Sequence, residues 1–95
     1  MNRIFWTNPA ISDLDAIHEY ISRDSEIYAD LVLSDIFDSV DRLITYPESG
    51  RMVPELNDKN VREIIVGNYR IMYENQSNSL KILTILYAAR LFPNN

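Results

Sequence analysis

The side chains best suited to chemistry in this sequence are two arginines and a tyrosine near its C-terminal end. Arg70 lies within one apolar segment, and Tyr87 and Arg90 lie at the end of the next. If these segments pair as antiparallel strands, the end of the second returns towards Arg70, and the three side chains meet at one end of a sheet. Such a group can hold a phosphate, because arginine presents a planar fork of N–H donors to oxyanions.

An ion pair is a second explanation of Arg70. Glu63 falls diagonally across from Arg70 in the same predicted pairing. Oppositely charged side chains are common neighbours on a sheet surface. On spacing alone the ion pair is the simpler explanation, and the phosphate site is the alternative.

Other polar patterns in the sequence favour neither catalysis nor metal binding. His18 is the only histidine, and no second ligand stands at a metal-binding spacing from it. Asp35, Asp38 and Asp41 recur every three residues, which is typical of the solvated face of a helix. With two glycines in the chain there is no glycine-rich phosphate loop. We therefore expect no metal and no cofactor.

Composition limits the classes of protein to consider. A length of 95 residues predicts a single domain over residues 1–95. No apolar run approaches a membrane span and no signal-peptide pattern is present, so we expect a cytoplasmic protein. The absence of cysteine excludes disulfides and thiolate metal sites. The net charge of −5 argues against general nucleic-acid binding.

The charge is unevenly distributed along the chain. Residues 1–50 hold three basic and ten acidic side chains, a balance of −7, whereas residues 51–95 hold six basic and four acidic ones, a balance of +2. The C-terminal half can therefore present a basic patch that the total charge hides.

The N-terminal half predicts a strand followed by two helices. Residues 3–7 form a short apolar strand, and Asn8 before Pro9 is a suitable helix start, with Asn8 as the cap. Apolar residues then recur at helical spacing in two stretches, separated by a break at Asp24-Ser25 that can cap the second helix. Two amphipathic helices joined this tightly form an antiparallel hairpin. Pro47 ends the second helix, and an irregular connector over residues 51–60 follows.

The C-terminal half predicts a three-stranded antiparallel meander. Segments 61–66, 69–74 and 80–90 are rich in β-branched and aromatic residues. Gly67-Asn68 is a two-residue hairpin turn, which sets Val66 opposite Tyr69. We expect a four-residue turn over residues 76–79, with Glu74 opposite Lys81. The same register pairs Tyr73 with Ile82, Ile71 with Thr84 and Tyr69 with Leu86. The fold class is α+β, with the helical hairpin on one face of the sheet, and the place of the first strand is open.

The predicted pairing divides the strands into two faces. The face towards the helices carries Ile64, Val66, Tyr69, Ile71, Tyr73, Ile82 and Leu86. The opposite face carries Val61, Glu63, Ile65, Arg70, Met72, Glu74, Lys81, Leu83, Ile85 and Tyr87. That second face is too apolar for an ordinary solvated surface, and we interpret it as a binding surface.

The C-terminal half resembles a known protein family. The residues that carry the resemblance are Val61-Arg62-Glu63-Ile64, then Val66-Gly67-Asn68-Tyr69-Arg70-Ile71-Met72-Tyr73, then Ile82-Leu83-Thr84-Ile85-Leu86-Tyr87-Ala88-Ala89-Arg90. They are similar to the Tyr-Arg-(Ile/Leu)-x-Tyr strand and the following apolar strand of the RelE/ParE superfamily, which comprises toxins of type II toxin–antitoxin modules. The Pro-Ala helix start, the Asp-Leu pair and the Tyr-Pro-x-x-Gly loop also fit, so the resemblance covers nearly the whole chain.

The resemblance implies a small growth-inhibiting toxin that a cognate antitoxin neutralises. The family divides between inhibitors of DNA gyrase and ribosome-dependent mRNA endonucleases. In the nuclease branch, Arg70 and Arg90 match arginines that contact the RNA phosphate, and Tyr87 is a third catalytic candidate. Tyr87 departs from the ParE-like segment, where histidine is common. We nevertheless favour the ParE-like, gyrase-binding branch, because only five residues follow Arg90, Lys59 is the only lysine of the connector and the total charge is acidic. The alternatives are a RelE-like endonuclease acting on mRNA at the ribosome and a decayed, non-toxic family member.

The resemblance also implies a place for the antitoxin. The helices occupy one face of the predicted sheet, so the apolar opposite face is left for a partner segment, bound as a helix in a groove or as an added strand. The predicted antitoxin-binding residues are Val61, Ile65, Arg70, Met72, Leu83, Ile85 and Arg90.

Overall fold

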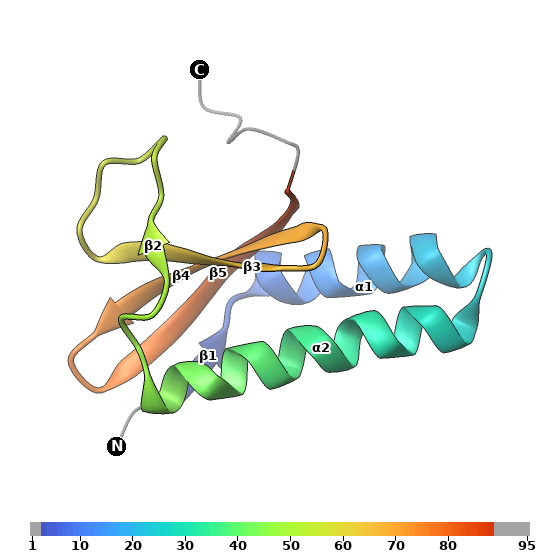
Figure 1. Cartoon of the computed structure of the whole chain (residues 1–95), viewed down its shortest axis with the longest axis horizontal. Coiled ribbons are helices and arrows are strands. Elements are labelled where there is room, and N and C mark those ends of the chain that lie inside the picture. Colours follow the sequence, from blue (N-terminus) through green and yellow to red (C-terminus); the bar gives the residue numbers. More distant parts are fainter. Residues whose placement is uncertain (1–2, 89–95) are drawn as a thin grey trace.

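Two helices lie against one face of a five-stranded sheet (Figure 1). The computed structural model describes residues 3–88. The elements are β1 (Arg3–Trp6), α1 (Asn8–Ser22), α2 (Glu26–Thr45), β2 (Arg51–Met52), β3 (Val61–Val66), β4 (Tyr69–Gln76) and β5 (Ser79–Tyr87). The strand order is β1-β5-β4-β3-β2, in which β1 runs parallel to β5 and the other neighbours are antiparallel. The predicted α+β fold, helical hairpin and meander are confirmed.

Side-chain caps begin both helices. The hydroxyl of Thr7 accepts a hydrogen bond from the Ala10 backbone N–H at 3.3 Å, so Thr7 caps α1. The predicted cap, Asn8, is instead the first helical residue. Thr7 rather than Asn8 is the cap because the Thr7 hydroxyl also donates to the carbonyl of Ile82 at 2.8 Å, which fixes the start of the helix against β5. Ser25 caps α2 as predicted, by accepting from the Tyr28 N–H at 3.1 Å.

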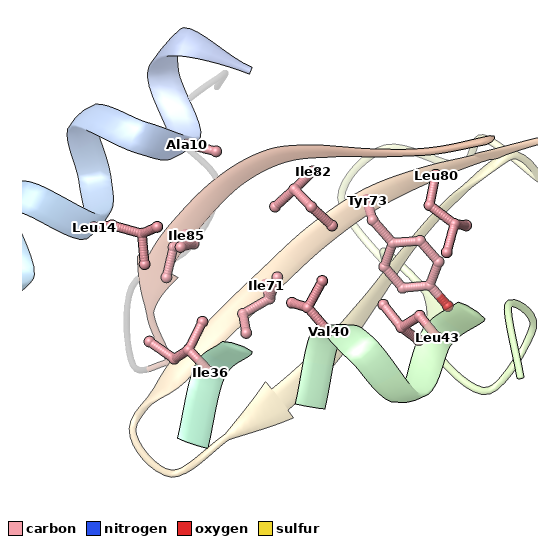
Figure 2. Close-up of a cluster of buried hydrophobic side chains, with 10 residues drawn as sticks. All are labelled: Ala10, Leu14, Ile36, Val40, Leu43, Ile71, Tyr73, Leu80, Ile82 and Ile85. Atoms are coloured by element: carbon pink, nitrogen blue, oxygen red, sulfur yellow. The ribbon is translucent and has the colours of Figure 1, made fainter. Parts of the chain in front are cut away.

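The main hydrophobic core lies between the helices and the sheet (Figure 2). Its buried members are Ala10 and Leu14 from α1, Ile36, Val40 and Leu43 from α2, and Ile71, Tyr73, Leu80, Ile82 and Ile85 from the sheet. The apolar spacing of each helix turns one stripe of side chains towards the strands, and removal of this surface from water is the main force that holds the two layers together.

The β3–β4 hairpin has the predicted register. Val66 pairs with Tyr69 across the two-residue turn. Gly67 has a φ of +57°, which a residue without a Cβ adopts at little cost. The turn chemistry therefore sets this hairpin.

The β4–β5 pairing departs from the predicted register halfway along. The turn has two residues, 77 and 78, rather than four, and Glu74 pairs with Lys81 as expected. Between Met72 and Tyr73 the register shifts, because Leu83 is an extra residue in β5 that has no partner in β4. Beyond this bulge, Ile71 pairs with Ile85 and Tyr69 with Tyr87, not with Thr84 and Leu86. The predicted faces of Ile85 and Leu86 are therefore wrong: Ile85 lies in the main core, and Leu86 lies on the opposite face.

A carboxylate from α1 stabilises the bulge. One oxygen of Asp13, Oδ2, accepts hydrogen bonds from the hydroxyl of Thr84 at 2.6 Å and from the backbone N–H of Ile85 at 2.9 Å. A bulge interrupts the ladder of backbone hydrogen bonds, and the partly buried N–H group needs another acceptor. Asp13 supplies that acceptor.

The connector after α2 is more ordered than predicted. The hydroxyl of Tyr73 donates to the carbonyl of Pro47 at 2.8 Å and accepts from the Gly50 N–H at 3.0 Å. Residues Arg51–Met52 then form β2, a short edge strand beside β3 that the sequence prediction lacked. The following residues fold over the sheet face that the helices leave open. There Val53 is buried with Val61 and Met72, and Leu56, Leu83 and Leu86 pack around them.

None of the helices within residues 3–88 is both long and apolar enough to cross a membrane.

Candidate functional site

Arg70 is buried in an ionic cluster on the sheet face away from the helices. Only 4% of its surface is exposed. Its Nε donates to Oε1 of Glu63 at 2.7 Å, and its Nη1 and Nη2 donate to the two carboxylate oxygens of Glu55 at 2.9 and 2.8 Å. The predicted pair with Glu63 is confirmed, but the predicted exposure of Arg70 is wrong. The cause is the connector, which places Glu55 over the guanidinium.

The ionic cluster extends to the edge of the sheet. Glu63 is 1% exposed, and its second oxygen accepts from Nε of Arg51 at 2.6 Å. Hydrogen bonding to Glu55 raises the pKa of Arg70, desolvation opposes that rise, and the hydrogen bond and charge of Glu63 add to it. Buried carboxylates and guanidinium groups persist where each charge has a partner. We call Arg51, Glu55, Glu63 and Arg70 the ionic cluster.

The predicted antitoxin-binding residues differ widely in exposure. Met72 is 1% exposed and Val61 is also buried, because Val53 and Leu56 of the connector pack over them. Ile85 is buried on the helix side, because the bulge at Leu83 reverses its face.

Two of these residues keep accessible surface on the predicted face. Ile65 is 51% exposed and Leu83 is half-buried. Arg90 lies outside the described residues. The continuous open apolar face expected from the pattern is therefore reduced to separate areas.

Arg70 and Tyr87 do not converge. Tyr87 pairs with Tyr69 across the strands, and their rings make an edge contact with centroids 5.9 Å apart. Tyr87 lines a hollow together with residues of both helices, whereas Arg70 faces the connector on the other side of the sheet. The predicted position of Tyr87 beside Arg70 is wrong, again because the bulge at Leu83 reverses the face of every later residue in β5.

A groove that the sequence interpretation missed lies between the helices and the β3–β4 turn. Two adjoining hollows of about 270 and 110 Å³ form it, and both are lined by Tyr28, Val32, Asn68 and Tyr69. We call it the tyrosine groove. Its aromatic wall consists of Tyr20 from α1, Tyr28 from α2, Tyr69 from β4 and Tyr87 from β5, and Asp24 and Asp35 are its acidic lining residues. Burial raises the pKa of the Tyr69 phenol, and its neighbours Tyr87, Tyr28 and Tyr20 raise it further.

The sequence indicates the positions of only some of the tyrosines that form the groove. Tyr20 and Tyr28 flank the break between the predicted helices, and Tyr69 begins a predicted strand. The fourth member, Tyr87, was placed on the wrong face. Only the correct register of β5 brings the four phenols to one place.

The described residues contain no group of three or more histidine or acidic side chains that could hold a metal. His18 instead shares a hydrogen bond of 2.8 Å with Asp30, which joins the two helices at an exposed position.

Comparisons with known proteins agree with the fold. Residues 4–92 match the family described as ParE toxin of type II toxin-antitoxin system, parDE. The chain is 37% identical to toxin Y4kP of Sinorhizobium fredii, over 96% of this chain and 93% of the relative. It is 34% identical to toxin RelE2 of Caulobacter vibrioides, over 96% of this chain and 100% of the relative.

A solved structure shares the same arrangement of elements. The chromosomal ParDE TA system from P. aeruginosa superposes with a TM-score of 0.74 at 24% identity, covering 92% of this chain and 96% of the other. The match to the family over residues 4–92, together with full-length relatives above 30% identity, shows that this chain belongs to the ParE toxin family of type II toxin–antitoxin systems.

Proposed function

We propose that this chain inhibits growth in the cytoplasm by binding DNA gyrase, and that a cognate antitoxin neutralises it. Membership of the ParE toxin family implies a toxin with an antitoxin partner. The choice of gyrase follows the ParE-like branch of the resemblance.

The environment of Arg70 is the observation that favours this mechanism over mRNA cleavage. A nuclease of this family needs an arginine free to contact the scissile phosphate as charge develops on it. Here the Arg70 fork is already occupied by Glu55 and Glu63, and Tyr87 points away on the other face of the sheet. A phosphate would have to displace a bidentate carboxylate from a buried site, which is costly.

The antitoxin is proposed to contact the sheet face away from the helices where that face stays accessible. Ile65 is the most exposed of the predicted residues and Leu83 adds further apolar surface. Ile65→Glu should weaken antitoxin binding, because it places a carboxylate in an apolar contact. The fold should survive because Ile65 is half exposed. Calorimetric titration with the antitoxin and a thermal melt of the variant test both expectations. An unchanged affinity for the antitoxin would show that Ile65 is not part of the toxin–antitoxin interface.

The mechanism is tested by expression of the chain alone and by two parallel assays. We expect growth arrest, inhibition of gyrase-catalysed supercoiling by the purified chain, and intact mRNA in ribosome-containing reactions. Cleavage of mRNA in the presence of ribosomes would establish the endonuclease mechanism instead. Normal growth with folded protein present would identify a non-toxic family member.

A further inference from the structure

The tyrosine groove brings several exposed aromatic side chains together outside the hydrophobic core. Tyr20, Tyr28 and Tyr87 are all exposed, and the exposed Leu31 of α2 also lines the groove. Tyr20 is 71% exposed and Leu31 is 57% exposed. A contiguous apolar patch of this kind on a small protein marks an interaction surface. Tyrosine is also among the residue types that contribute most to protein–protein binding.

The charge around the groove indicates the chemistry of its occupant. Asp24 and Asp35 line it, and no lysine or arginine is among the lining residues that the structure describes. The groove belongs largely to the helical hairpin, within the half of the chain whose balance is −7. A nucleic acid would be repelled, and a second copy bound groove to groove would bring like charges together. A partner with basic side chains around an apolar centre is complementary.

We propose that the tyrosine groove is the surface by which this toxin docks on its target enzyme, through a segment of gyrase that presents apolar side chains flanked by lysine or arginine. The inference rests on the proposed gyrase-binding function and adds the contact surface to it. Gyrase holds DNA, and a protein surface that holds DNA is rich in lysine and arginine because it must neutralise phosphates. Tyrosine rings accept a guanidinium over their faces, so the aromatic wall and the acidic lining select the same partner.

Substitution of the aromatic wall is the first test. The double variant Tyr28→Ala, Leu31→Ala removes two exposed side chains from the groove, and Tyr46→Ala removes an exposed tyrosine elsewhere. The concentration of chain that halves gyrase supercoiling should rise at least about tenfold for the double variant and stay unchanged for the control. Thermal melts of both variants establish that each is folded.

Reversal of one charge is the second test. Asp35 lines the groove, whereas Asp41 is an exposed aspartate further along the same helix. Asp35→Lys should weaken inhibition several-fold more than Asp41→Lys at low salt. That difference should shrink as ionic strength rises from about 0.05 M to about 0.3 M, because salt screens exposed charges.

The remaining outcomes distinguish an error in the docking surface from an error in the proposed inhibition of gyrase. If the unmodified chain inhibits gyrase and the groove variants inhibit it equally, the docking surface is wrong and the proposed function stands. Groove variants that lose only antitoxin binding would assign the groove to the antitoxin and overturn the inference. If the unmodified chain sediments as a dimer and the groove variants sediment as monomers with inhibition unchanged, the groove binds a second copy and the inference is overturned. Failure of the unmodified chain to inhibit gyrase would contradict both the proposed function and the proposed docking surface.

Discussion

The two faces of the sheet are closed in different ways. On one face, α1 and α2 bury a continuous set of apolar side chains over β4 and β5 (Figure 2). On the other face a connector without a helix closes the sheet, and it buries three apolar residues, Val53, Val61 and Met72, beside the ionic cluster. The first closure depends on area removed from water, and the second combines a smaller apolar cluster with buried charges that must stay paired. Loss of one side chain should therefore have different consequences on the two faces.

The largest expected effect is on the connector face, at Glu63. Glu63→Ala removes the carboxylate that pairs with both Arg51 and Arg70, and Arg70 is buried, so its charge loses one partner. Removing one member of a buried ion pair costs roughly 3–5 kcal/mol. We expect the free energy of unfolding in urea to fall by about this amount.

Arg51→Ala is the matched control for that prediction. It breaks a contact with the same carboxylate, but the Arg51 side chain is 63% exposed. Its loss should cost about 1 kcal/mol, because the Arg51 side chain is largely solvated and Glu63 keeps its hydrogen bond to Arg70. Equal losses for the two variants would mean that burial of the cluster does not determine its contribution to stability.

A pair of adjacent residues compares apolar packing on the two faces. Ile71 and Met72 are neighbours in β4, both fully buried, and they point to opposite faces. Ile71→Ala leaves a cavity between sheet and helices and should cost about 2–5 kcal/mol. Met72→Ala should cost less, because a loop can settle into the space more readily than two packed helices. Urea denaturation of both variants measures the difference, and a larger loss at Met72 would contradict it.

Local sequence patterns predicted the helices, the meander and the β3–β4 register, because apolar periodicity and the Gly67-Asn68 turn act over short distances. The bulge at Leu83 was not predictable, since neither glycine nor proline marks it and its stabilising partner, Asp13, lies in another element. The pairing of Arg70 with Glu63 followed from strand register. The approach of Glu55 did not, because it depends on the path of the connector.

The two glycines are needed for different reasons: Gly50 has no room for a Cβ, whereas Gly67 has a positive φ. A Cβ on Gly50 would lie 2.6 Å from the Tyr73 hydroxyl and 2.7 Å from the backbone carbonyl of Glu63. Gly50→Ala must therefore displace the connector where it meets the sheet, at a cost of about 1–3 kcal/mol. A Cβ on Gly67 meets nothing within 4 Å. Gly67→Ala should lose only about 1 kcal/mol, for its positive φ. Amide exchange should speed up around residues 50–53 in the first variant and around the turn in the second.

The smallest expected effect is a pH dependence that belongs to the helix-covered face. Burial raises the pKa of Tyr69 and of Tyr73 above the ordinary value of 10.0, so both phenols hold their protons longer in the native chain than in the unfolded one. Above pH 10 the unfolded chain then binds fewer protons, and stability decreases as the pH rises through the native pKa values. The pKa of Arg70 is also raised, so the ionic cluster keeps this positive charge over the same range.

Tyr69→Phe removes one titrating phenol, whereas Tyr73→Phe would also remove the hydrogen bonds to Pro47 and Gly50. Urea denaturation from about pH 8 to about pH 11 should give a shallower alkaline decline for Tyr69→Phe than for the unmodified chain. Identical slopes would show that Tyr69 titrates alike in the folded and unfolded states.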